Sequence, residues 1–477
     1  MVLIATTIMR FTVGARSPLW LDETWTGMIA SQPTLADFAR QCYLDVNGPL
    51  YYLIAWPWAH LSGLSNAALR FPAFLFGAAT PLVALLPVRI MDRQVRFVWS
   101  AFLACWIPGL AFSQEARCYS LVLFLGAANA VAYAALLRGP SARRAWTWTA
   151  VSSLLILSHY YGLVLVGIQG VAYLAIHRAR ALRTWPAAFA FAPAAASLTM
   201  HAMLLLKFAS ADRGWIPLLT VHDLFAQVVF VFGPAFLIAA MCLVLLLALV
   251  WRLRSKDRPA GAAFPVMLGV VVACSIAAAI VAVSVGFVRP AYVNRYLTAF
   301  VPGVFLGVAL LADRLSRHLR LAPQMLAALP FSVTILWAAL TGEDGSPFNF
   351  QVASQALMAD RPARLVFLWD TPMRVDPAAL RGVGGFFFQR AGHPVAVDPV
   401  SLNPGEDPNT VLLGRAAQPH TAILWIYDLS VHDAAARRRP PVIGRLDPAW
   451  RCRNFGKGKL GVVACDKPEL GQRPSTS

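Results

Sequence analysis

The chain has 477 residues, of which 58% are hydrophobic and 13% charged, and its mean hydropathy is +0.59. This composition excludes an ordinary soluble globular protein and predicts a polytopic membrane protein. The formal net charge of +18 fits arginine-rich cytoplasmic loops, which are a topology signal, better than nucleic-acid binding.

The chain starts with an apolar segment and a polar loop. Residues 1–15 are apolar apart from Arg10 and lack a basic start and a small-residue cleavage site. They therefore predict a first membrane span rather than a removed signal peptide. Residues 16–66 are too polar for lipid and form the first outer loop. Within this loop, 33–43 and 50–61 are expected to be amphipathic helices in the membrane interface.

Ten further apolar runs have spanning or near-spanning length. They cover residues 69–88, 97–113, 118–137, 146–158, 162–176, 186–208, 228–251, 262–287, 296–312 and 323–341. With the first span, they predict an all-α membrane domain of about 11 transmembrane helices over residues 1–341.

Basic residues set the orientation of these spans. They fall in alternate loops, which the positive-inside rule places in the cytoplasm: Arg89, Arg93 and Arg96; Arg138, Arg143 and Arg144; Arg178, Arg180 and Arg183; Arg252, Arg254, Lys256 and Arg258; and Arg314, Arg317 and Arg320. Residues 146–176 have such loops on both sides, so they must cross twice and turn at 158–162. An odd number of spans leaves the C-terminal tail outside.

Residues 342–477 predict an extracytoplasmic, or periplasmic, α/β domain. Buried strands are expected at 364–370, 394–397 and 421–426, with a helix at 377–390. If this tail is extracytoplasmic, Cys452 and Cys465 are reasonable disulfide partners, which leaves Cys42 unpaired. Four other cysteines lie in or beside apolar runs, where they need no function: Cys105, Cys118, Cys242 and Cys274.

The outer loops collect the polar residues that predict a site. The candidate catalytic residues are Asp22, Glu23 and Glu115, and the candidate substrate-binding residues are Arg117, Tyr119, His159, Tyr160, Lys207, Arg213, Arg289, Arg295 and Tyr296. Each has an ordinary alternative: a loop acid, an ion pair between spans, a turn histidine or an interfacial arginine. Their convergence on one membrane face favours a reaction site, because ionisable groups at membrane depth are costly.

These residue types suit the transfer of a sugar from a lipid phosphate. A carboxylate accepts the acceptor's proton, and cations offset charge on the departing phosphate. Asp22, or less favourably Glu23, is the candidate base. Arg117 and Arg295 are the candidate phosphate partners, with Lys207 and Arg213 in reserve.

Six motifs in consistent order carry a family resemblance over residues 1–340. They are Asp22-Glu23-Thr24, Gly48-Pro49-Leu50-Tyr51-Tyr52, Arg70-Phe71-Pro72, residues 113–119 (Ser-Gln-Glu-Ala-Arg-Cys-Tyr), His159-Tyr160-Tyr161-Gly162 and Asn294-Arg295-Tyr296-Leu297. The chain resembles bacterial membrane glycosyltransferases of the C-type fold (GT-C), in the protein O-mannosyltransferase and lipid A aminoarabinose transferase superfamily.

The resemblance implies that Asp22 carries catalysis, that Glu115 supports it, and that a polyprenyl-phosphate sugar is the donor, transferred with inversion at the bacterial inner membrane. Two departures matter. Asn47-Gly48-Pro49 stands where many relatives have a basic residue before Pro-Pro, and Trp25 replaces an arginine of some aminoarabinose transferases. The second departure argues against transfer to lipid A in particular.

Other functions remain as alternatives. A transporter or flippase of a lipid-linked sugar is disfavoured by the missing internal repeat and the acidic first loop. A receptor or assembly partner with this fold is a third class. No tight His or Cys ligand spacing predicts a metal, so no cofactor is expected, with a divalent cation at Asp22, Glu23, Glu115 and His159 as the alternative. The sequence leaves open the sugar, which is a hexose or a pentose, and the acceptor, which is a glycan, a lipid or a protein.

Overall fold

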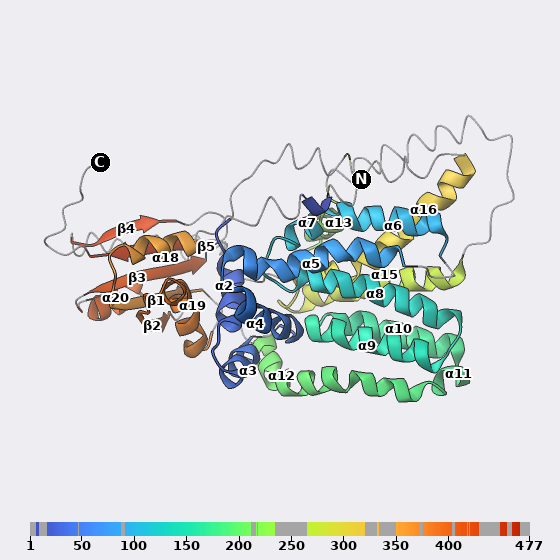
Figure 1. Ribbon diagram of the computed structural model, residues 1–477, viewed down its shortest axis with the longest axis horizontal. Coiled ribbons are helices and arrows are strands. Elements are labelled where there is room, and N and C mark those ends of the chain that lie inside the picture. Colours follow the sequence, from blue (N-terminus) through green and yellow to red (C-terminus); the bar gives the residue numbers. More distant parts are fainter. Residues whose placement is uncertain are drawn as a thin grey trace.

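A computed structural model shows a helical part followed by a smaller sheet domain (Figure 1). The structure describes residues 6–8, 17–45, 47–86, 91–210, 216, 218–233, 265–319, 332, 350–371, 375–402, 406–416, 418, 420–428, 449–455 and 460–467. Most of the expected first span, of the last expected span at 323–341 and of the run at 228–251 lies outside these residues, as do Arg213 and Cys242.

The polar loop at 16–66 is more helical than expected. It folds into α2 (Leu21–Ala30), α3 (Leu35–Leu44) and α4 (Leu50–Ser62). The helices expected at 33–43 and 50–61 are confirmed, whereas α2 was expected to be loop. The first turn of α2 holds Asp22 and Glu23, which complement the positive end of the helix dipole. Glu23 also accepts a hydrogen bond from the amide of Trp20 at 3.2 Å.

Most of the other expected spans contain helices. The helices of this part of the chain, of which α11 lies in an expected loop between two spans, are α5 (Asn66–Ala84), α6 (Arg93–Cys105), α7 (Ile107–Phe112), α8 (Tyr119–Arg138), α9 (Ala142–Ser158), α10 (Gly162–His177), α11 (Ala179–Leu182), η1 (Trp185–Phe191), α12 (Ala192–Ser210), α13 (Asp223–Phe232), α15 (Val266–Val288), η2 (Asn294–Ala299) and α16 (Val301–Leu319). The expected turn at 158–162 separates α9 from α10. The run at 97–113 is broken at Trp106, whose extended backbone separates α6 from α7.

Four described helices are long and apolar enough to cross a membrane: Asn66–Ala84, Tyr119–Arg138, Trp185–Leu206 and Val266–Val288. Their burial differs, because 78% of the apolar window in Tyr119–Arg138 is buried but only 11% of the one in Trp185–Leu206. Tyr119–Arg138 therefore lies in the centre of the bundle and Trp185–Leu206 at its periphery. The count of about eleven spans stays a prediction.

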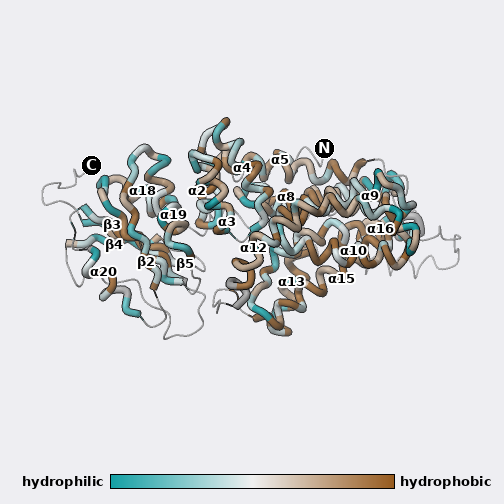
Figure 2. Tube along the Cα trace, turned by 90° about the horizontal axis from the view of Figure 1, so that it is seen from below, coloured by the Kyte–Doolittle hydropathy of each residue, from teal (hydrophilic) through white to brown (hydrophobic). Residues whose placement is uncertain are grey.

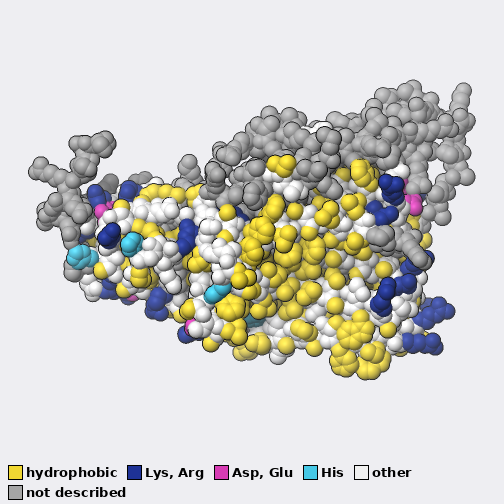
Figure 3. Space-filling view, in the orientation of Figure 1, with side chains coloured by type: hydrophobic (Ala, Val, Ile, Leu, Met, Phe, Trp, Pro, Cys, Tyr) yellow, Lys and Arg dark blue, Asp and Glu magenta, His cyan; other side chains and the backbone are white. Residues whose placement is uncertain are grey.

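The helical part has an apolar body and a basic end. Hydrophobic residues run along most of its helices (Figure 2), and hydrophobic side chains cover the middle of the face shown in Figure 3. Lys and Arg side chains gather at the end farthest from the sheet domain. The first outer loop, α2 to α4, lies at the opposite end, between the bundle and the sheet domain (Figure 1).

The sheet domain contains α18 (Phe350–Met358), β1 (Arg364–Asp370), α19 (Pro377–Arg390), β2 (Ala396–Ser401), α20 (Pro408–Ala416), β3 (Thr421–Asp428), β4 (Arg451–Asn454) and β5 (Leu460–Asp466). The strand at 364–370 and the helix at 377–390 are confirmed with their expected bounds. The sheet order is β2-β1-β3-β5-β4, with β1 parallel to β2 and β3 and the last two strands antiparallel. Cys452 and Cys465 pair directly across β4 and β5 and form the expected disulfide.

The two parts pack against each other through α19 and α2. A Cβ at Gly27 would lie 2.5 Å from the Phe386 ring, and a Cβ at Gly382 would lie 2.9 Å from Met28. Gln351 accepts a hydrogen bond from the amide of Leu19 at 2.8 Å. The helix that carries Asp22 is therefore held directly by the sheet domain.

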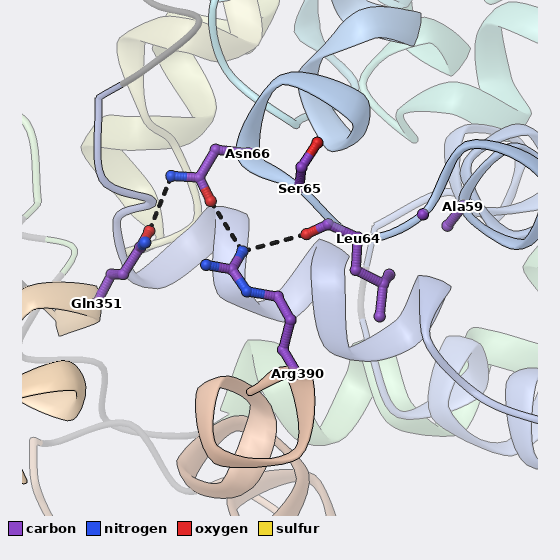
Figure 4. Close-up of a pocket in the computed structure, with 7 residues that line it drawn as sticks. Ala59, Leu64, Ser65, Asn66, Gln351 and Arg390 are labelled. Carbon is purple, nitrogen blue, oxygen red and sulfur yellow. Dashed lines mark hydrogen bonds between the residues drawn. The ribbon is translucent and has the colours of Figure 1, made fainter. Parts of the chain in front are cut away.

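An open cleft of about 740 Å³ lies at the same junction. Arg390 bridges it by donating to the carbonyl of Leu64 and to Asn66, which in turn donates to Gln351 (Figure 4). The lining residues are Ala59, Gly63, Leu64, Ser65, Asn66, Gln351 and Arg390. None of the candidate site residues is among them.

Candidate active site

Asp22 is the centre of the polar cluster at the sheet-domain end of the bundle. Its carboxylate accepts a hydrogen bond from Arg295 at 3.1 Å, and the two side chains are 26% and 20% exposed. The backbone carbonyl of Asp22 accepts from Arg117 at 3.2 Å. Three segments far apart in sequence, which are α2, the 113–118 loop and η2, therefore meet at Asp22: η2 at its carboxylate and the loop at its backbone carbonyl.

The two arginines keep free hydrogen-bonding capacity. Arg117 is buried and also donates to the hydroxyl of Tyr52 at 3.4 Å. The guanidinium carbon of Arg295 lies 5.2 Å from the centre of the Tyr119 ring. Within the described chain, the Nε atoms of Arg117 and Arg295 are buried without a hydrogen-bond partner. Buried donors of this kind are costly, which favours a site completed by an anionic ligand or water.

Glu23 makes its hydrogen bonds with groups other than Arg117 and Arg295. Its Oε1 accepts from Arg70 Nε at 2.6 Å and from the Ala116 amide at 2.8 Å. Its Oε2 accepts from Arg70 Nη2 at 2.6 Å and from Trp20. The side chain is fully buried. Both oxygens are occupied, so this geometry favours Asp22 over Glu23 as the base.

Glu115 lies in the loop between α7 and α8 and is half-buried. Burial, together with the nearby charge of Glu23, raises its pKa to about 8, against the opposing effect of Arg295. The carboxyl is therefore mostly protonated at neutral pH. In this form it has an O–H group that can donate a hydrogen bond, and it adds no negative charge to the cluster.

An aromatic group closes one side of the cluster. The buried His159 ring lies 4.6 Å from Tyr296 and 6.1 Å from Tyr119, measured between ring centres. Tyr161 lies 4.8 Å from Tyr296. Burial, with Arg295 and Arg117 nearby, lowers the pKa of His159 to about 3, so the imidazole is neutral at physiological pH.

The other candidate residues lie elsewhere or outside the description. Tyr160 faces α12, where its hydroxyl bonds to Ser197 at 3.0 Å and to His201. Arg289 is exposed just after α15. Lys207 lies in α12 with its side chain outside the described part, and Arg213 is not described. Among the described residues, no group of three His, Cys, Asp or Glu side chains could hold a metal ion.

No functional role was predicted for Arg70, Asp45 or Tyr52, although Arg70 and Tyr52 belong to motifs of the family resemblance. Asp45 accepts hydrogen bonds from the Tyr52 hydroxyl at 2.7 Å and from Asn47, and Tyr52 lies beside Arg117. The position of Arg70 within an apolar run indicates a buried ion pair, because a charged residue within an apolar helix needs a partner. Asp45 carried no comparable signal.

Comparison with solved structures shows the fold. The chain aligns with ArnT from Cupriavidus metallidurans bound to undecaprenyl phosphate at a TM-score of 0.58 and 13% identity, covering 99% of this chain and 98% of that one. The apo form of the same protein aligns at a TM-score of 0.57 and 13% identity, with 97% of both chains covered. The oligosaccharyltransferase of Archaeoglobus fulgidus aligns at a TM-score of 0.48 and 13% identity, over 85% of this chain and 64% of that one.

No protein-family model matches the chain, and no curated protein matches it by sequence. The resemblance expected from the sequence motifs is thus confirmed as a shared GT-C fold. The helical membrane-protein class with a small sheet domain is confirmed in the same way.

Proposed function

We propose that this chain is a membrane glycosyltransferase that moves a sugar from a polyprenyl-phosphate carrier to an acceptor at the extracytoplasmic face of the bacterial inner membrane. The observation that carries the proposal is the contact of the Asp22 carboxylate with Arg295, beside an Arg117 whose Nε has no partner. The shared fold supports it, since ArnT of that fold was solved with undecaprenyl phosphate bound.

The reaction needs one base and one anion site. An acceptor hydroxyl or amine attacks the anomeric carbon, and its proton passes to Asp22. The bond from the anomeric carbon to the phosphate oxygen breaks, and its electron pair stays on the phosphate. Arg117 and Arg295 offset the added charge. Attack opposite the leaving group inverts the anomeric centre.

Glu115 and the aromatic group have supporting roles. A protonated Glu115 donates to a phosphate or sugar oxygen, where a carboxylate would repel the phosphate. The rings of His159, Tyr119 and Tyr296 offer flat faces for a sugar ring, and their size excludes water from one side of the cluster. Glu23 does not contact substrate in this scheme.

The test is transfer by the purified full-length protein from polyprenyl-phosphate hexoses and aminopentoses, with and without a chelator of divalent cations. Asp22→Asn is expected to lower kcat by about 100- to 10,000-fold, the usual contribution of a general base. Asp37→Asn is the matched control, because Asp37 is an exposed acid in the first turn of the neighbouring helix α3.

Two results would overturn the proposal. One is sugar transfer by Asp22→Asn at the rate of the wild-type protein. The other is movement of intact lipid-linked sugar across vesicles with no transfer product, which would make the protein a transporter.

A further inference from the structure

A buried ion pair lies directly behind the proposed site. Arg70 on α5 and Glu23 on α2 make two parallel hydrogen bonds of 2.6 Å, and their side chains are 6% and 0% exposed. Arg70 also donates to the carbonyl oxygens of Ser17 and Pro18. A buried pair of this kind adds little net stability compared with apolar packing, so its other contacts matter.

One of those contacts reaches the loop of the proposed site. Glu23 Oε1 accepts the amide hydrogen of Ala116 at 2.8 Å. Ala116 stands between Glu115 and Arg117, and Glu23 follows Asp22 in the first turn of α2. A single carboxylate therefore links the segment that carries the proposed base to the loop that carries Glu115 and Arg117.

We propose that Glu23 and Arg70 are positioning residues that lock the 113–118 loop to the start of α2 and thereby align Glu115 and Arg117 with Asp22. This inference rests on the proposed function. It assigns Glu23 no contact with substrate and gives Arg70 a role in the reaction that acts through the loop.

The same pair acts on the charge of Glu115. The groups that face this carboxyl are Glu23 and Asp22 from α2, Arg295 from η2, and Arg117 from its own loop. After burial, the Glu23 charge is the largest influence that favours the protonated form. Arg70 fixes the position of the Glu23 carboxylate by a bidentate contact, so the pair favours a neutral Glu115 beside a donor phosphate.

Two substitutions separate position from charge. Glu23→Gln keeps an oxygen that accepts from Ala116 but removes the charge, whereas Glu23→Ala removes both. We expect Glu23→Ala to lower kcat by about 100-fold, as a displaced reactive group does. Since the pKa of Glu115 is about 8, we expect an alkaline limb near that pH in the wild-type profile, and we expect Glu23→Gln to move this limb lower by about one pH unit.

Two further variants show whether the effects come from unfolding of the protein around an unpaired buried charge. Glu23→Gln combined with Arg70→Gln removes both charges, so no unpaired charge stays buried, and the same shift is expected. Arg70→Lys retains the charge but loses the second hydrogen bond, so kcat falls and the limb stays in place. Asp398→Asn is the control, because it breaks a partly buried ion pair with Arg364 in the sheet domain and should leave the pH profile unchanged.

A second readout does not need turnover. The carboxylic acid band of Glu115 in infrared difference spectra, identified by its loss in Glu115→Gln, should titrate at lower pH in Glu23→Gln and in the double variant. An unmoved band together with wild-type kcat in the Glu23 variants would overturn the inference. If the wild type transfers no sugar but the band shifts, the proposed function fails while the coupling of Glu23 to Glu115 stands.

Discussion

Glu115 gives a test at the scale of one residue, because its protonation is linked to folding. Its pKa rises from 4.5 to about 8 in the folded chain. Below pH 4.5 both states hold the proton. Between pH 4.5 and 8 the unfolded carboxyl releases its proton and the native one keeps it, so stability falls as pH rises. Above pH 8 the penalty is constant.

We therefore expect Glu115→Gln to raise Tm at pH 8 relative to wild type, and to change Tm much less at pH 4.5. Thermal unfolding of the protein in detergent micelles at the two pH values measures this difference. Equal effects at both pH values would show that the native carboxyl has an ordinary pKa. Asp37→Asn, an exposed acid, should show no such pH dependence.

The side chains that meet at the site follow from the sequence only in part. The sequence predicted that Asp22, Glu115, Arg117 and Arg295 would gather on one face, since membrane topology restricts where polar residues emerge. It ranked Asp22 above Glu23 as the base but did not show that the two acids have different partners. Neighbouring residues on a helix point about 100° apart, so only recognition of α2 as a helix would have shown that the two acids face different partners.

At the scale of elements, a glycine sets how closely the first outer loop approaches the α9–α10 turn. A Cβ at Gly48 would lie 2.0 Å from the backbone oxygen of Leu157 and 2.8 Å from the carbonyl carbon of Ser158. These are backbone atoms at the end of α9, just before His159, and they cannot move aside as a flexible side chain can. The segment with Asp45 and Tyr52 can therefore contact the turn only because residue 48 is a glycine and has no Cβ.

Gly48→Ala is expected to destabilise the protein by about 1–3 kcal/mol, the range for overpacking, and to lower transfer by displacing Tyr52 from Arg117. Thermal unfolding and the transfer assay measure the two effects. Gly167→Ala on α10 is the matched control, because a Cβ there meets nothing within 4 Å. If Gly48→Ala matched this control in both measurements, the close approach would be absent in the folded protein.

The sequence predicted elements best where hydrophobic pattern alone decides them. The buried run at 364–370 is a strand and 377–390 is a helix, with bounds as expected. The antiparallel strands β4 and β5 were not expected. β4 has only four residues and is exposed along its whole length, so it carries no apolar pattern of a strand. The start of α2 was missed because its stabilising contacts come from Arg70 and Ala116, which are distant in sequence.

At the scale of the whole molecule, the candidate site and the basic loops occupy opposite ends of the bundle. Arg138 ends α8, Arg143 begins the next helix, and Arg180 lies in α11. The end of α8, the start of α9 and α11 lie far from α2 and the sheet domain (Figure 1). The positive-inside rule then predicts that the sheet domain lies outside the cytoplasm, and its Cys452–Cys465 disulfide suits an oxidising compartment.

Cysteine labelling tests this orientation in spheroplasts with a membrane-impermeant maleimide. Gln389→Cys is exposed on α19 of the sheet domain and should react in intact spheroplasts. Ala142→Cys is exposed at the start of α9, at the basic end, and should react only after permeabilisation. The parent chain corrects for background, because its described free cysteines, Cys42, Cys105, Cys118 and Cys274, are buried. Labelling of Ala142→Cys alone in intact spheroplasts would invert the topology, and it would place Asp22, which α19 holds through α2, on the cytoplasmic side.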